Sequence, residues 1–159
     1  MTALLAPANF RFLFRQDQGT VSRAVWWTGT LALGILLAAL TLVWFALSSG
    51  AHRSLDATNL IDVRTAFTYL YLVIYAVAFL LIAVSHYNLS AKRFRARGKP
   101  AGLAGILPLA ALLTGAAHWI APRVGDAMPG WTVPAVDFAM LVIVIWTMLE
   151  LGLKRGAGD

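Results

Sequence analysis

The sequence predicts an all-α integral membrane protein, a bundle of four membrane-spanning helices with both termini cytoplasmic. Three observations carry this prediction. Four apolar stretches of roughly 20 residues are nearly free of charge. Hydrophobic residues make up 60% of the chain and charged residues only 13%. The basic residues are distributed unevenly between the loops. Because a helix rises about 1.5 Å per residue, about 20 residues cross a hydrocarbon core of about 30 Å.

The four apolar stretches define the expected organisation of the chain. The predicted spans are residues 25–47, 66–84, 101–120 and 133–151. All four are apolar on every side, whereas the helices of a soluble fold of this size carry a polar face. We therefore expect a cytoplasmic or interfacial segment over residues 1–24, a transmembrane domain over residues 25–152 and a short cytoplasmic tail over residues 153–159.

The segment before the first span has an amphipathic pattern. Phe10, Leu13 and Phe14 recur at helical spacing, while Arg11 and Arg15 occupy other positions. This pattern predicts a short helix that lies on the membrane surface. The alternative is a frayed chain terminus.

The first span is expected to stay in the mature protein. Residues 46–48 (Ala-Leu-Ser) resemble a signal-peptide cleavage site. However, the apolar run of about 23 residues is longer than the apolar region of a signal peptide, which needs only about 7–15. Trp26 and Trp27 at its start are typical of the interface between lipid and water.

The lysines and arginines predict the orientation. Ten of the thirteen fall in the N-terminal segment, in the loop after the second span and in the tail. Only Arg53, Arg64 and Arg123 fall in the other two loops. Positively charged short loops stay cytoplasmic. Both termini are therefore expected inside, and an even number of spans agrees.

The loop after the second span holds a cluster of five cations. They are Lys92, Arg93, Arg95, Arg97 and Lys99. This cluster has three interpretations: a determinant of topology, a binding site for anionic lipid head groups or a nucleic-acid site. No recognition fold accompanies it, so nucleic acid is not expected. The expected partners are the lipid bilayer and its anionic head groups.

The third span is rich in small residues. The pairs Ala101/Gly105 and Ala111/Gly115 have the spacing that lets two helices approach closely in lipid. We expect this span to be the packing centre of the bundle, and a cavity lined by small residues is the alternative. Such surfaces also allow self-association or contact with other membrane proteins.

Two polar residues fall inside the third and fourth spans. Asp137 lies about one turn into the fourth span, and His118 lies at a similar depth near the end of the third. The sequence therefore predicts a possible pair between them. An intramembrane acid suggests function by default, whereas an acid near a helix amino terminus also has a purely structural role.

A second polar group is expected at the cytoplasmic surface. Glu150 closes the fourth span, at the level of Arg23 and the basic loop that contains Arg93. A carboxylate at this interface is held best by a guanidinium group, which offers a planar fork of donors. We therefore predict an ion pair between Glu150 and Arg23 or Arg93.

No set of reactive residues predicts catalysis, a cofactor or a metal site. The chain has no cysteine. Its three histidines, His52, His86 and His118, are far apart and belong to different sides of the membrane. Catalytic, cofactor-binding and metal-ligating residues are therefore all predicted to be absent.

Three segments of the chain resemble one protein family. Residues 19–27 (GTVSRAVWW) resemble the opening G-R-x-S-R-x-x-F/Y-W motif of small bacterial inner-membrane proteins grouped as domain of unknown function 805. Lys92-Arg93-Phe94 followed by Gly98 resembles its R-R-L-H-D-x-G-x-S-G segment. Residues 150–152 resemble its closing E-L-G. The resemblance covers roughly residues 14–158 and implies a bacterial inner (plasma) membrane location, with no established activity.

The chain departs from the family pattern at two places. Arg95 and Ala96 stand where the family has a His-Asp pair, and Thr20 stands where it has arginine. Any acid–base or metal role of that pair is therefore absent from this protein.

Three classes of function remain. The first is a non-enzymatic scaffold, assembly partner or envelope-stress component. The second is a transport or channel subunit with a polar path near Asp137 and His118, and the third is a membrane-embedded enzyme that acts on lipid. Four short spans with small loops favour the first.

Overall fold

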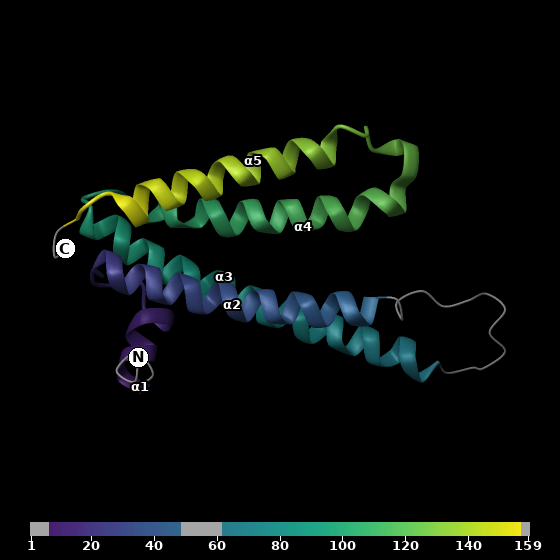
Figure 1. The fold of residues 1–159 in the computed structure, drawn as a ribbon, viewed down its shortest axis with the longest axis horizontal. Coiled ribbons are helices and arrows are strands. Elements are labelled where there is room, and N and C mark those ends of the chain that lie inside the picture. Colours follow the sequence, from purple (N-terminus) through teal and green to yellow (C-terminus); the bar gives the residue numbers. More distant parts are fainter. Residues whose placement is uncertain (1–6, 49–61, 157–159) are drawn as a thin grey trace. The chain divides into compact units, whose positions relative to one another are not determined.

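The computed structural model describes residues 7–48 and 62–156. Within them every regular element is helical, and four helices are long and apolar enough to cross a membrane (Figure 1). The predicted all-α class with four spans is confirmed. The first six residues, the predicted loop with His52 and Arg53, and residues 157–159 of the predicted tail lie outside the described part.

The first two long helices extend beyond their predicted spans. α2 covers Arg23–Ser48 and α3 covers Val63–Ala96. The second predicted span ended at residue 84, so the prediction that Lys92, Arg93 and Arg95 lie in a loop is wrong. Apolar composition marks only the stretch that suits hydrocarbon. The helix continues because its polar end is buried against other segments of the chain.

The third and fourth spans form a helical hairpin. A 3-10 turn, η4 (Ala101–Gly105), leads into α4 (Ile106–Val124), and the short turn η5 (Gly125–Ala127) leads towards α5 (Thr132–Thr147). The last element, η6 (Met148–Leu153), is a wide π-helical continuation of α5. α4 and α5 lie side by side (Figure 1).

The N-terminal segment is helical as predicted. α1 (Pro7–Phe10) continues into a wide turn, η2 (Arg11–Arg15). Leu13 and Phe14 are buried, whereas Arg11 and Arg15 are exposed. The predicted short amphipathic helix is confirmed and the frayed terminus is wrong. Its contact with a membrane surface stays a prediction.

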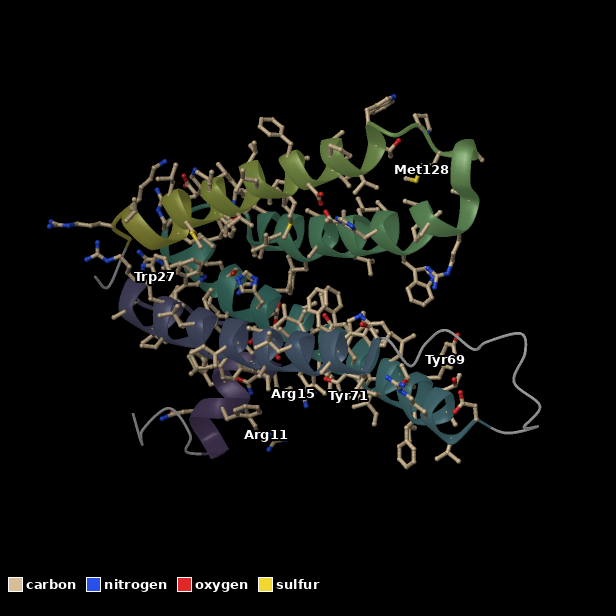
Figure 2. The ribbon with its side chains drawn as sticks, turned by 45° about the vertical axis from the view of Figure 1, so that its right-hand side comes forward. Arg11, Arg15, Trp27, Tyr69, Tyr71 and Met128 are labelled. Atoms are coloured by element: carbon tan, nitrogen blue, oxygen red, sulfur yellow. The ribbon has the colours of Figure 1, made fainter. Side chains whose placement is uncertain are left out.

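The chain divides into two compact units. One comprises residues 31–83 and the other comprises residues 1–30 with 84–159. In the first unit, the hydroxyl of Tyr71 donates to the carbonyl of Leu40 at 2.6 Å, and the hydroxyls of Thr41 and Tyr75 lie 3.0 Å apart (Figure 2). These bonds join the α2 and α3 portions of that unit. The second unit contains every candidate site residue.

The close approach predicted at the third span is not found in the described part of the chain. A Cβ atom on Gly115 would meet nothing within 4 Å, and one on Gly105 would meet only the ring of Tyr87 at 3.9 Å. The tight approaches occur instead at Gly29, against Leu89, and at Gly152 in η6. Gly105 and Gly115 therefore leave space, and the tight approaches at Gly29 and Gly152 lie near the carboxyl end of α3.

Candidate functional site at the carboxyl end of α3

The carboxyl end of α3 is the most completely buried part of the described chain. Residues 88–94 are all buried, and Lys92 and Arg93 have no exposed surface. Charged side chains are almost never fully buried unless they find partners. The N-terminal segment, the start of α2 and η6 supply these partners. We call this the α3-end cluster and define it by Trp26, Trp27, Asn88, Ser90, Lys92, Arg93, Arg97, Glu150 and Gly152.

Lys92 holds the N-terminal segment. Its Nζ donates to the main-chain carbonyl of Phe12, to that of Leu13 at 3.1 Å and to that of Gln16 at 2.5 Å. An ammonium group has three donors. The last carbonyls of a helix lack partners within the helix and carry the negative end of its dipole. All three donors therefore serve the carboxyl end of η2.

Arg93 has the same role for the end of η6. Its Nε donates to the carbonyl of Leu151 at 3.1 Å and its Nη2 to that of Lys154 at 2.8 Å. Its Nη1 reaches the carbonyl of Val21, before α2, at 3.5 Å. A planar guanidinium group can bind several acceptors at once. Arg93 therefore joins the segment before α2 to the carboxyl end of η6.

Glu150 is a buried carboxylate among three cations. Its side chain is only 4% exposed. Nη1 of Arg97 pairs with Oε1, Nζ of Lys99 lies 2.5 Å from the same oxygen, and Nζ of Lys154 lies 2.6 Å from Oε2. The carboxylate thus neutralises part of the local positive charge. Charge-assisted contacts to both of its oxygens stabilise it in its buried position.

The predicted ion pair between Glu150 and Arg23 or Arg93 is not formed. The three residues do lie close to one another, but both guanidinium groups donate to main-chain carbonyls of η6, at 3.1 Å for Arg93 and 3.4 Å for Arg23. These carbonyls end a helix and attract cations themselves. A sequence signal existed for one true partner, since Glu150 and Lys154 have the four-residue spacing at which opposite charges pair near a helix.

The structure also corrects the predicted lipid contacts. The five predicted residues were Lys92, Arg93, Arg95, Arg97 and Lys99. The first two are completely buried and bound to carbonyls, so their predicted contact with head groups is wrong. Arg97 is 12% exposed and is bound to Glu150. Arg95 pairs with Asp17 at 3.3 Å. Most of the basic segment therefore binds the protein itself.

Two tryptophans complete the cluster from α2. Nε1 of Trp26 donates to Oγ of Ser90 at 3.2 Å, and Nε1 of Trp27 donates to the carbonyl of Gly152 at 3.0 Å. Trp26 is 1% exposed. Its ring packs inside the protein and not against lipid head groups, and its predicted depth at the lipid–water interface stays a prediction.

His118 and Asp137 form the pair that the sequence suggested. Nε2 of His118 lies 2.9 Å from Oδ1 of Asp137, which joins α4 to α5. The two side chains are 56% and 47% exposed. The pair stands apart from the α3-end cluster, near the other end of α4.

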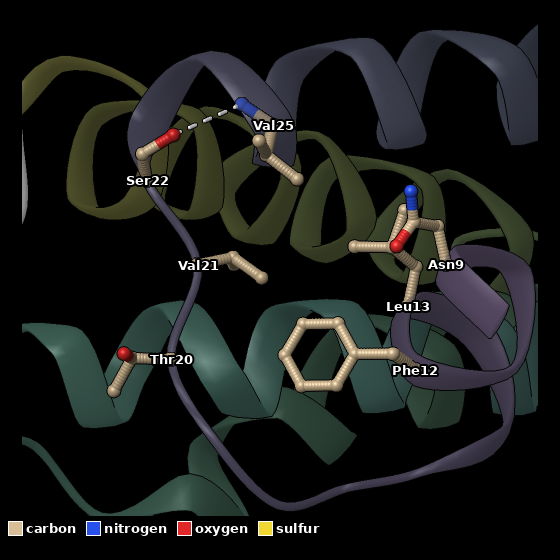
Figure 3. Close-up of a pocket in the computed structure, with 7 residues that line it drawn as sticks. All are labelled: Asn9, Phe12, Leu13, Thr20, Val21, Ser22 and Val25. Carbon is tan, nitrogen blue, oxygen red and sulfur yellow. Dashed lines mark hydrogen bonds between the residues drawn. The ribbon is translucent and has the colours of Figure 1, made fainter. Parts of the chain in front are cut away.

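A small pocket lies beside the N-terminal segment. Its volume is about 310 Å³. Figure 3 shows that it separates this segment from the stretch that leads into α2. Its lining is Asn9, Phe12, Leu13, Thr20, Val21, Ser22 and Val25. None of these side chains is charged, so the lining provides neither an acid–base pair nor a set of metal ligands.

Neither a metal site nor a similar protein identifies a function for the described residues. Across residues 7–48 and 62–156, no group of three His, Cys, Asp or Glu side chains is placed to hold a metal ion. Comparison of the chain with protein-family models, curated proteins and solved structures finds no match.

Replacing Lys92 with methionine is expected to release the N-terminal segment. Methionine fills a similar volume but leaves the carbonyls of Phe12, Leu13 and Gln16 without donors, and each buried unsatisfied group costs about 1–3 kcal/mol. Tryptic cleavage after Arg15 in detergent should accelerate at least tenfold. Arg155→Met removes an exposed cation and is the matched control. Equal cleavage rates in the two variants would contradict the role of Lys92.

Proposed function

We propose that this protein is a non-enzymatic scaffold or assembly component of the bacterial inner membrane. Four helices that can span a membrane are compatible with a multi-pass membrane protein. The observation that supports a scaffold is the use of the charges in the α3-end cluster. Lys92 and Arg93 bind main-chain carbonyls, and Glu150 binds the side chains of Arg97, Lys99 and Lys154. They fix three distant segments of the chain instead of facing a substrate.

We also propose that the chain is a divergent relative of the domain of unknown function 805 family. The three segments that resemble the family are far apart in sequence, yet they meet in the α3-end cluster. Trp27 from the first segment donates to Gly152 of the third, and Arg93 from the second donates to Leu151. Motif residues that contact one another have a shared structural reason to occur together, which supports the resemblance.

The proposed orientation places the α3-end cluster at the cytoplasmic face. Since the chain has no cysteine, a single introduced cysteine reports one position. Met128→Cys, between α4 and α5, should react with a membrane-impermeant maleimide in intact spheroplasts. Arg155→Cys should react only after the membrane is permeabilised. The reverse pattern would overturn the orientation.

A scaffold must contact other membrane proteins through its exposed apolar helices. Leu113 on α4 and Leu141 on α5 are more than half exposed, whereas Ala117 is 8% exposed. A photoreactive amino acid at either leucine should give discrete protein adducts in living cells, and at Ala117 it should not. If both leucines give only lipid adducts, no protein contacts these faces of α4 and α5. That result would contradict the scaffold proposal.

A transport subunit is the second candidate, because His118 and Asp137 form a half-exposed polar pair in helices that can span a membrane. Intramembrane acids often mark ion pathways. Proteoliposomes that contain the purified protein would then carry a proton or cation flux that Asp137→Asn abolishes. Flux equal to that of empty liposomes favours the scaffold.

A further inference from the structure

The N-terminal segment is held in one orientation by its buried side. Leu13 and Phe14 face the protein interior and are 4% and 9% exposed. Nδ2 of Asn88 donates to the carbonyl of Phe14 at 2.9 Å, and Lys92 binds the carbonyls at the end of η2. Because these contacts fix the segment, they also fix which of its side chains face outwards.

The outward side combines two cations with one aromatic ring. Arg11 and Arg15 are four residues apart, so they share one side of a helix, and both are exposed (Figure 2). Phe10 is 44% exposed, whereas the ring of Phe12 lies over Nζ of Lys92 and lines the pocket. Within the described part of the chain, neither arginine forms an ion pair with an acidic side chain. This side is thus cationic, with one apolar edge.

Chain connectivity keeps the N-terminal segment close to the membrane. Only residues 16–22 separate η2 from the start of α2, a helix that is apolar enough to span a bilayer. Seven residues reach at most about 25 Å when fully extended. The segment must therefore lie within that distance of the start of a span, where lipid head groups are found.

We propose that the outward side of the N-terminal segment, with Arg11 and Arg15 at its centre, binds anionic phospholipid. Each guanidinium group offers a planar fork of donors that matches phosphate oxygens. Phe10 inserts between head groups, as aromatic side chains do in helices that lie in the interface. Arg11 and Arg15 thus take the lipid-binding role predicted from the sequence for Lys92 and Arg93, which are buried and bind main-chain carbonyls. The lipid site does not depend on the proposed scaffold function.

The test measures lipid affinity of the full chain by native mass spectrometry from detergent. The probes are phosphatidylglycerol, which is anionic, and phosphatidylcholine, which has no net charge. The double variant Arg11→Gln/Arg15→Gln should bind phosphatidylglycerol about thirtyfold more weakly, from about fivefold for each arginine. Its affinity for phosphatidylcholine should stay within twofold of that of the original chain. Arg11→Lys/Arg15→Lys should retain most of the preference for the anionic lipid.

Two controls make the outcome decisive. Arg123→Gln/Arg155→Gln removes two exposed arginines elsewhere and should leave the affinity for phosphatidylglycerol within twofold. An equal loss in this control would show a net-charge effect and overturn the site. Unchanged binding in Arg11→Gln/Arg15→Gln would also overturn it. Full competition by millimolar glycerol phosphate would show a site for free anions and overturn the assignment to lipid.

Discussion

Replacing Glu150 with glutamine is expected to lower the free energy of unfolding by about 3–5 kcal/mol, the cost of removing one member of a buried ion pair. The carboxylate is the shared counter-charge of Arg97, Lys99 and Lys154. Without it, three cations repel one another beside the buried end of α3. Unfolding of the purified protein in mixed micelles measures the change.

A double-mutant cycle separates the contributions of the three cations. Arg97 is 12% exposed, whereas the side chain of Lys154 is 57% exposed and its pair is screened by solvent. The coupling between Glu150→Gln and Arg97→Gln should therefore exceed about 1 kcal/mol, and the coupling with Lys154→Gln should be smaller. Equal couplings would contradict the assignment of Arg97 as the main partner.

Replacing Gly152 with alanine is expected to lower the free energy of unfolding by about 1–3 kcal/mol, the usual cost of overpacking. A Cβ atom there would lie 2.6 Å from Cζ2 of Trp27, whose indole also donates to the carbonyl of Gly152. The ring has to move and its hydrogen bond weakens. Loss of stability in detergent, followed with intrinsic tryptophan fluorescence, measures the effect.

Gly115→Ala is the matched control for this substitution. Both glycines are helical, but a Cβ atom on Gly115 would meet nothing within 4 Å. Its stability should be unchanged or slightly raised, because alanine is the better helix former. If the two variants lose equal stability, the contact between Gly152 and Trp27 is not the cause.

The four spans were predictable because lipid solvation acts on each helix separately. About 20 apolar residues suffice to identify a span, whatever the helix packs against. The end of α3 was not predictable in this way. Its residues after Val84 include Lys92 and Arg93, which apolar composition assigns to a loop. They are helical because their partners lie 58 to 80 residues away in the sequence.

Contacts between site residues were predictable only where two side chains meet because they lie at the same depth in the membrane. His118 and Asp137 lie at similar depths on consecutive spans joined by a short connection, and they do meet. Depth also placed Glu150 near Arg93, but it could not show which group each would bind. That choice depends on helix-end carbonyls, whose positions follow from where η2 and η6 end.

Lys92 and Arg93 also impose an order on biosynthesis. The N-terminal segment is made first, yet its anchor on α3 follows about 80 residues later, and the carbonyl that Arg93 binds in η6 follows after another 58. At about 5–20 residues per second, Arg93 waits about 3–12 seconds for that carbonyl. During this interval Arg93 has no carbonyl of η6 to bind, whereas the carbonyls that Lys92 binds in the N-terminal segment have already been made. Lys92 can therefore cap η2 as soon as α3 has formed, whereas Arg93 can cap η6 only after the last helix has been made.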